Sequence, residues 1–419
     1  MSMPSDIIPL CEPFFGGKER EYVDECVRSG WVSSVGQFVN RFEAMFADYV
    51  QAPEAVAVST GTAALHLSLL AVGVQPGDEV LVSSMTFIAP ANAIRYVGAH
   101  PVFIDAEPDY WQMDMSAVQS FLETQTKRAE DGALVNRATG RRISALLPVH
   151  ILGHPVDMDR LMVITNAYNL KVVEDATESL GGFWRGRALG TIGHAGCFSF
   201  NGNKLMTTGG GGMVVAGSSR AEFRREDDLN KKITRHVRHL STQAKLPGGE
   251  YIHNEVGYNY RLTNLQAALG CAQLEQLDSF LQRKKEIAAA YQAAFGSAEE
   301  QGNSGIRIKF MREADYVRSA WWLCTVLVDD SGRDASQEPK RDRGSRELIA
   351  HLAANGVIAR PLWQPMHLSP AHETCHVPGQ PACPVAERLY EQGVSLPSSV
   401  GITDAQLQRV IALVKEFAA

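Results

Sequence analysis

Short apolar runs alternate with helical patterns along the first half of this 419-residue chain, and this alternation constrains the fold more than any other feature. Continuous apolar runs between turn signals are typical of strands that are buried on both faces. Strands that are separated by helices form a mostly parallel sheet covered by helices on both sides. The sequence therefore predicts an α/β domain with seven strands, at residues 55–59, 79–84, 101–106, 143–151, 170–175, 196–200 and 212–217.

The pattern changes near residue 270. Apolar residues at helical spacing predict one long helix from Asn264 to Phe295. A smaller α+β domain is expected beyond it, with strands at residues 306–310, 322–329 and 357–363 and a helix at 345–356. Thr403 and Gln406 have the spacing of a capping box and predict the start of a final helix. We therefore divide the chain into residues 1–270 and 271–419.

Composition excludes several classes of protein. Hydrophobic residues make up 45% and charged residues 21%, as in soluble globular proteins, and the net charge of −7 does not favour nucleic acid as a partner. The seven cysteines are scattered and never spaced C-x-x-C, which argues against a zinc or disulfide framework. The first residues lack a basic segment followed by an apolar one, and no apolar run is long enough to cross a membrane. We expect a cytoplasmic protein.

Two charged stretches, residues 124–142 and 330–346, are predicted to be surface insertions. The second contains a basic cluster of Lys340, Arg341 and Arg343. Such a cluster is interpreted as a solvated face, with contact to a substrate phosphate as the alternative.

Three places carry the chemistry. Asp175 ends a predicted strand, where ligands bind in open α/β sheets, although a carboxylate there can also cap a helix. The stretch STGTAALHL runs from a strand through Gly61 and Thr62 into a helix, whose start is suited to an anion; Ser59 or Thr60 can equally be an ordinary N-cap. The chain contains neither G-x-G-x-x-G nor a P-loop.

Lys204 is the third place. It follows a predicted strand, a turn and Ser199, and it precedes four glycines, Gly209 to Gly212, which permit close backbone approach. A lysine amine that loses its proton can form an imine with an aldehyde. Lysine, carboxylate and anion-binding turn together are what pyridoxal phosphate requires.

The sequence resembles the DegT/DnrJ-type sugar aminotransferases, which are fold type I pyridoxal-phosphate enzymes. The likeness is carried by SGWVSSVGQFVNRFEAMFADYV, STGTAALHL, MTFIAPANAI, PVHILGHPVDMD, VVEDATESLGG, FSFNGNK and EVGYNYRLTNLQAALGCAQLEQLD. These stretches are most similar to the branch that aminates position 4 of UDP-linked 4-keto-6-deoxy-N-acetylhexosamines, with L-glutamate as donor. Amination of a GDP- or dTDP-linked keto sugar is the alternative.

The resemblance implies a role for each matching residue. Lys204 would bind the cofactor aldehyde covalently, Asp175 would pair with the pyridine nitrogen, and Gly61, Thr62 and Ser199 would bind the phosphate. Phe87 would stack on the cofactor, although a phenylalanine after a strand is more often a core residue. Asn259 would reach the phosphate from the neighbouring subunit, which implies a homodimer with shared sites.

Some positions are less well defined. Glu178 stands where many members of the family have histidine or glutamine, and either a site role or a place on a helix surface is open. Ser34, His150 and His367 are candidates for substrate binding, and His154 for lining the pocket, although a loop histidine is more often a packing residue. The chemistry needs no metal.

Two other functions compete with aminotransfer. Related sugar dehydratases carry histidine in place of the lysine, so Lys204 argues against that activity. A non-catalytic regulator on the same fold is the remaining alternative.

Overall fold

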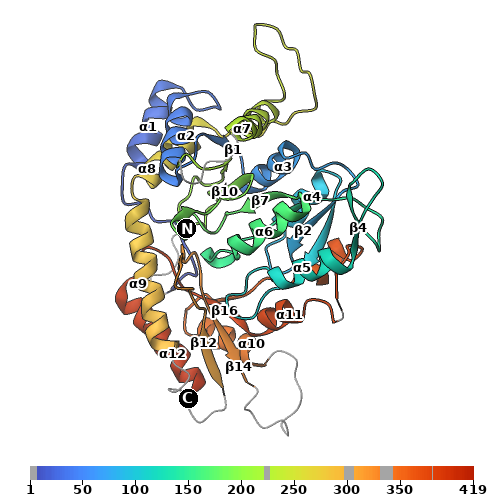
Figure 1. The fold of residues 1–419 in the computed structure, drawn as a ribbon. Helices are drawn as coiled ribbons and strands as arrows, with labels where there is room; N and C mark the ends of the chain where they lie inside the picture. The colour runs from blue at the N-terminus through green and yellow to red at the C-terminus, as the bar shows by residue number, and fades with distance from the viewer. Residues whose placement is uncertain (1–6, 221–226, 297–305, 331–342, 380) are drawn as a thin grey trace.

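The computed structural model describes residues 7–220, 227–296, 306–330, 343–379 and 381–419 (Figure 1). The predicted basic cluster of Lys340, Arg341 and Arg343 lies outside the described residues, except for the backbone of Arg343. All seven cysteines are described, and all are free thiols.

The seven predicted strands form one sheet, in the order β1-β11-β10-β7-β6-β2-β3. Strand β11 runs antiparallel to β1 and β10, and the other neighbouring pairs are parallel. The predicted α/β class with a mostly parallel sheet is therefore confirmed. The strands are β1 (Ala55–Val58), β2 (Glu79–Ser83), β3 (His100–Ile104), β6 (Ile143–Leu147), β7 (Lys171–Asp175), β10 (Ala195–Ser199) and β11 (Gly212–Val215).

Helices cover both faces of this sheet because successive side chains of a strand point to opposite faces. Val56 and Val58 of β1 belong to the hydrophobic cluster that includes residues of α3 (Gly61–Ala71), α4 (Ala89–Tyr96) and α7 (Asp227–Ser241). Ala55 and Ala57 of the same strand lie in a second cluster, with α1 (Glu19–Ser29), α2 (Gln37–Val50) and α8 (Asn264–Leu274). A third cluster joins α5 (Met115–Thr124) and α6 (Met158–Tyr168) to Val102 and Ile104 of β3, Ile143 and Leu146 of β6, and Val172 of β7.

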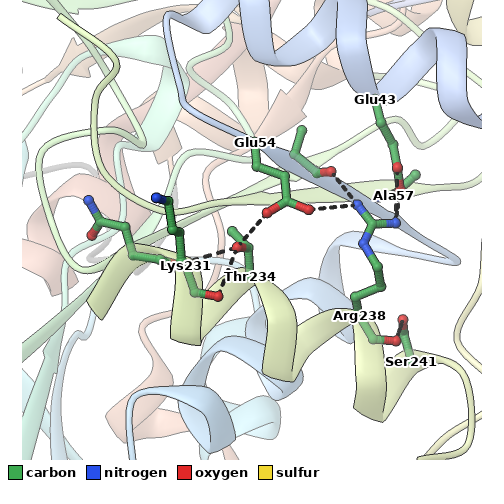
Figure 2. Close-up of polar contacts among 9 residues, drawn as sticks. Glu43, Glu54, Ala57, Lys231, Thr234, Arg238 and Ser241 are labelled. Carbon is green, nitrogen blue, oxygen red and sulfur yellow. Dashed lines mark hydrogen bonds and ion pairs between the residues drawn. The ribbon is translucent and has the colours of Figure 1, made fainter. Parts of the chain in front are cut away.

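Figure 2 shows how α7 is attached to β1, the strand that leads into α3. The guanidinium of Arg238 on α7 lies 3.0 Å from the Glu43 carboxylate of α2 and 3.3 Å from that of Glu54. It also donates to the carbonyl oxygen of Ala55 at the start of β1. Glu43 in turn accepts a hydrogen bond from the N–H of Ala57. Three elements are thus held together where the chain enters the sheet.

The predicted long helix from Asn264 to Phe295 is wrong as one element, because the chain forms α8 and then α9 (Leu277–Phe295). The residues between them, Glu275 and Gln276, keep negative φ angles close to the helical region. The helical spacing of apolar residues therefore continues across the break and conceals it. The side chain of Gln276 donates to Glu19 of α1 and to the carbonyl of Ala272, which fixes the junction.

A second sheet has the order β12-β14-β16-β15, with antiparallel neighbours. Strands β12 (Arg307–Phe310) and β14 (Cys324–Asp329) correspond to predicted strands, β15 is only Arg360–Pro361, and β16 (Gly393–Leu396) was not predicted. Its helices are α10 (Arg343–Ala354), α11 (Pro384–Gln392) and α12 (Asp404–Ala418), and α12 begins with the predicted Thr403–Gln406 capping box. The domain boundary near residue 270 stays a prediction.

The stretch predicted as the first insertion, residues 124–142, contains a hairpin of β4 (Thr126–Arg128) and β5 (Leu134–Asn136). A three-stranded sheet joins β8 (Phe183–Trp184) and β9 (Arg187–Ala188) to β13 (Val317–Arg318). Among the described residues, no helix has both the length and the apolar character that a membrane span needs.

Candidate active site

A cavity of about 350 Å³ lies at the carboxyl ends of the parallel strands, where residues that end or follow β1, β2, β6, β7 and β10 meet. Residues from the second half of the chain also line it. Its lining includes Thr60, Gly61, Thr62, Thr86, Phe87, Val149, Asp175, Thr177, Glu178, Ser199, Asn201, Asn203, Lys204, Gly210, Gly211, Trp322, Arg360 and Trp363.

The start of α3 forms one end of the cavity. Thr60 is the N-cap and accepts a hydrogen bond from the N–H of Ala63 at 3.0 Å, so the capping interpretation of Thr60 is correct. The N–H groups of Gly61 and Thr62 have no partner within the helix and lie at its positive end. A Cβ atom at Gly61 would lie 2.7 Å from the Cβ of Ser199. Glycine there allows the Ser199 hydroxyl to approach the helix start, and together they form a site for an anion.

Asp175 is the last residue of β7 and is buried. No helix begins directly after it, so the helix-cap interpretation is wrong; its carboxylate accepts instead from the N–H of Thr177 at 3.0 Å, in a local turn. Burial raises the pKa of Asp175, and the hydrogen bonds from Thr177 and the charge of Lys204 act in the opposite direction. A buried acid at this position can pair with a basic ring nitrogen.

Lys204 reaches the cavity from a turn in which its N–H bonds to the carbonyl of Asn201. Its Nζ atom lies 3.5 Å from Oε1 of Glu178 and 3.9 Å from the centroid of the Trp322 indole. The glycines that follow let this loop pass close to α3, since a Cβ at Gly212 would lie 2.5 Å from the carbonyl oxygen of Thr60. The side chain is 14% exposed, so the amine is shielded but accessible from the cavity.

Glu178 is a buried carboxylate in the cavity, and the alternative of a helix-surface position is wrong. Its Oε2 accepts from the N–H of Leu152 at 2.8 Å, while Oε1 faces Lys204. Burial raises the pKa of Glu178 to about 7, against the opposing effects of Lys204 and the Leu152 N–H and with a contribution from the nearby Asp175 charge. The carboxyl group can therefore gain or lose a proton near neutral pH next to the lysine amine.

Comparison with known proteins identifies the family, because the family model of the DegT/DnrJ/EryC1/StrS aminotransferases matches residues 14–415. The chain belongs to this aminotransferase family. It is 35% identical to "GDP-perosamine synthase" of Escherichia coli O157:H7, over 98% of both chains. It is 37% identical to "Putative pyridoxal phosphate-dependent aminotransferase EpsN" of Bacillus subtilis, over 96% of this chain and 94% of the relative.

Solved structures agree with the fold of this aminotransferase. The structure titled "Putative sugar aminotransferase Spr1654 from Streptococcus pneumoniae, PLP-form" superposes with a TM-score of 0.81 at 26% identity and covers 98% of each chain. The fold type I architecture predicted from the sequence is therefore confirmed.

Two predicted site residues of the aminotransferase lie away from the cavity lining because their rings are used in packing. His150 is completely buried, and its ring contacts the Glu174 carboxylate at 3.1 Å and accepts from the N–H of Val156. His367 is fixed between the hydroxyl of Ser84 and the carboxylate of Glu387. Both rings make contacts inside the protein rather than with the cavity, and their assignment to substrate binding stays a prediction.

His154, predicted as a pocket candidate, also lies away from the active-site cavity. Its ring stacks on Tyr110 with 5.0 Å between the centroids, donates to the carbonyl of Pro155, and accepts from the N–H of Ala314. Burial lowers the pKa of His154 to about 4, so the ring is neutral at ordinary pH.

The remaining predicted residues divide in two. Phe87 lines the cavity and is 55% exposed, so it is not a core residue. Ser34 and Asn259 do not line the cavity of their own chain; Ser34 is half-buried and Asn259 is exposed. The assignment of Asn259 refers to a neighbouring subunit and stays a prediction.

Sequence reasoning missed the residues contributed by the second half of the chain. Trp322 and Trp363 stack with parallel rings, and the exposed guanidinium of Arg360 lies at the rim of the same cavity. A tryptophan pair in a predicted strand and loop has no distinctive spacing. The doublet Trp321–Trp322 was the available signal, since large aromatic residues often line small-molecule sites.

Proposed function

We propose that this aminotransferase transfers the amino group of L-glutamate to a nucleotide-linked keto sugar and uses pyridoxal phosphate as its cofactor. The observation that carries the proposal is one cavity that combines the Lys204 amine, the buried Asp175 carboxylate and the anion-binding start of α3. The names of the relatives support the cofactor and the substrate class, because they include a pyridoxal phosphate-dependent aminotransferase and a GDP-sugar synthase.

The residues present fit the cofactor. Gly61 leaves the space next to Ser199 that a Cβ would fill, and the adjacent helix start suits a phosphate dianion. Asp175 would hold the pyridine nitrogen in its protonated state, and the exposed ring of Phe87 would pack against the heterocycle. When bound, pyridoxal phosphate supplies an aldehyde that condenses with amines and a ring that accepts an electron pair.

The protein residues then have separate tasks. Lys204 would hold the cofactor between turnovers, and its neutral amine would carry a proton to and from the α-carbon of the amino donor. Glu178, 3.5 Å away, would accept a proton from Nζ or return one, since its pKa of about 7 lies near the working pH. Trp322 and Trp363 would exclude water from this exchange, and Arg360 at the rim suits a carboxylate or phosphate of a substrate.

The sugar is the finer part of the proposal. The motifs between residues 29 and 278 resemble the branch that aminates carbon 4 of UDP-linked 4-keto-6-deoxy-N-acetylhexosamines. The relatives named GDP-perosamine synthase favour a GDP-linked sugar instead. Both substrates present a ketone on a deoxyhexose joined to a diphosphate, so we propose that substrate class and amination at the ketone carbon.

We also propose a homodimer with shared sites. The segment before Asn259 extends from the body of the protein (Figure 1) and carries the exposed apolar residues Tyr251, Ile252 and Val256. Tyr251 and Val256 are 84% and 82% exposed, which is unusual for large apolar side chains that have no partner surface. A second copy that covers this segment would bring Asn259 to the phosphate of the neighbouring cavity.

The test is a substrate panel. The purified protein is incubated with pyridoxal phosphate, L-glutamate and UDP-, GDP- or dTDP-linked 4-keto-6-deoxy sugars, and both 2-oxoglutarate and the amino sugar are measured, the latter by NMR. We expect equal amounts of the two products with at least one sugar and none with Lys204→Ala. Formation of 2-oxoglutarate without any aminated sugar across the panel would reject the substrate class, and an active GDP panel with inert UDP sugars would reject the UDP branch.

A further inference from the structure

Trp322 contacts the active-site lysine segment in two ways. The face of its indole lies 3.9 Å from Nζ of Lys204. The indole N–H donates to the carbonyl of Asn203 at 2.8 Å, and Asn203 is the residue immediately before the lysine. One side chain therefore touches both the end of the lysine side chain and the backbone from which it starts. An ammonium group over a tryptophan face is also attracted to it.

The backbone of Trp322 is held in place on both sides. Its N–H donates to the carbonyl of Leu152 at 3.1 Å, and its own carbonyl accepts from Nζ of Lys284 at 2.7 Å. Leu152 is also the residue whose N–H binds the Glu178 carboxylate. Leu152 therefore holds both neighbours of Lys204: its carbonyl binds Trp322 and its N–H binds Glu178.

Lys284 is an unusual residue in the core. It lies on α9, is 1% exposed, and donates to the carbonyl oxygens of Trp322 and Ser398. In the described part of the chain, no carboxylate forms an ion pair with it. Buried lysines are rare unless they are paired or have a task. Lys284 binds the Trp322 loop to the loop after β16, which are both parts of the second half of the chain.

We propose that Trp322 is a positioning residue for Lys204, and that Lys284 acts through Trp322 by holding its carbonyl. The indole restricts the lysine to the side of the cavity that contains Glu178, so that the amine faces the incoming cofactor aldehyde. This inference rests on the proposed function only in taking Lys204 as the group that binds pyridoxal phosphate.

The first measurement is the rate at which the full-length, cofactor-free protein captures pyridoxal phosphate, without any amino donor. In this step the lysine nitrogen forms a double bond to the aldehyde carbon and one water molecule leaves. The rate is followed by absorbance, and the product is reduced with borohydride and mapped by mass spectrometry to residue 204. We expect Trp322→Leu to slow capture about 10-fold, because an amine that is no longer held over the indole adopts fewer orientations from which it can attack the aldehyde. Trp322→Phe, which keeps a ring face, is expected to restore most of the rate.

The matched control is Trp184→Leu. Trp184 is buried to a similar degree and its indole N–H donates to Asp159 at 3.0 Å, but it lies outside the active-site cavity. Its capture rate should stay within about twofold of the wild type. A general loosening of the protein by loss of a buried tryptophan would instead slow both variants.

The second measurement separates positioning from access. Acetylation of Lys204 by a small activated ester is measured at one pH in the cofactor-free protein, again by mass spectrometry. Trp322→Leu should raise this rate several-fold, because the shielded amine becomes open to solvent, while capture of the cofactor falls. Opposite changes in the two rates are expected only when the indole directs the amine.

The role of Lys284 is tested with Lys284→Met and the double variant with Trp322→Leu. If Lys284 acts through Trp322, Lys284→Met slows capture about threefold alone and adds nothing to Trp322→Leu, since residues that act in one chain are not additive. Full additivity would reject this part of the proposal. Equal capture rates in the wild type and Trp322→Leu would reject the inference alone, whereas wild-type capture at a residue other than 204 would reject it together with the proposed function.

Discussion

Replacing Glu178 with glutamine should change how the stability of the cofactor-free protein depends on pH. The Glu178 carboxyl is buried beside Asp175 and Lys204, and burial raises its pKa from 4.5 to about 7. In the unfolded chain the same carboxyl is exposed and has its ordinary pKa of 4.5. A difference of about 2.5 pH units between the two states corresponds to about 3 kcal/mol of stability.

The sign follows from which state holds the proton. Below pH 4.5 the carboxyl is neutral in both states, and the folded protein has the full benefit of burying an uncharged group. Between this pH and about 7 the unfolded chain has lost the proton while the folded protein keeps it, so stability falls as pH rises. Above about 7 the loss is complete. Glutamine cannot ionise, and Glu178→Gln should therefore escape this loss.

The assay is urea unfolding of wild type and Glu178→Gln between pH 4.5 and 8.5, with the free energy of unfolding taken from linear extrapolation. The advantage of the variant over the wild type should grow by about 3 kcal/mol across this range. Glu373→Gln provides the same chemical change at an exposed position. Parallel pH profiles for wild type and Glu178→Gln, or a variant that loses stability faster as pH rises, would refute the reasoning.

Four other substitutions test the site and its support. Gly61→Ala places a Cβ 2.7 Å from the Cβ of Ser199, and should lower the stability by about 1 to 3 kcal/mol and weaken cofactor binding in a fluorescence titration. Asp175→Asn should lower the rate of 2-oxoglutarate formation at least about 100-fold while far-UV circular dichroism stays unchanged. Glu174→Gln should lower the free energy of unfolding by about 3 to 5 kcal/mol at pH 8, with a smaller loss in acid. Burial alone would raise the pKa of Glu174, but His150 and three backbone N–H groups outweigh burial and lower this pKa. The stabilisation that the Glu174 carboxylate provides is therefore lost as pH falls. Arg238→Ala leaves the buried Glu43 without its cation (Figure 2). It should lower the free energy of unfolding, measured in urea, by about 1 to 3 kcal/mol.

The large sheet could be predicted from sequence because its signal is local. Each of its strands is a short apolar run between turn residues, and a strand buried on both faces needs nothing more to be recognised. The capping box at Thr403 is equally local. The break between α8 and α9 could not be predicted, because Glu275 and Gln276 stay close to helical geometry and the Gln276 side chain binds a partner, Glu19, that lies far away along the chain on α1. Strand β16 owes its identity to pairing with β14 and β15, which lie far away along the chain.

In the candidate site too, the residues with a local sequence signal could be predicted and those that depend on distant contacts could not. Lys204, Asp175 and Gly61 each follow a strand at the same edge of a parallel sheet, so the topology alone implies that they meet. The orientation of the histidines after β6 could not be predicted, because a position near that edge does not decide where a ring points. The ring of His150 turns toward the buried Glu174, and that of His154 turns toward Tyr110. Only the packed structure resolves such a choice.

The backbone of Leu152 connects Glu178 and Trp322, which lie far apart along the chain. Leu152 has a φ of 60°, in the left-handed region that a leucine rarely adopts, and such a conformation costs on the order of 1 kcal/mol or more. It persists because both polar groups of the residue are used: the N–H binds Glu178 and the carbonyl binds the N–H of Trp322. The positions of Glu178 and Trp322, the two neighbours of Lys204, therefore both depend on the backbone of Leu152. An unstrained turn at Leu152 would remove the backbone cost, but its N–H and carbonyl would no longer point at Glu178 and Trp322. The carboxylate and the indole would then not be held at fixed positions on either side of Lys204, and the orientation of the lysine would no longer be restricted.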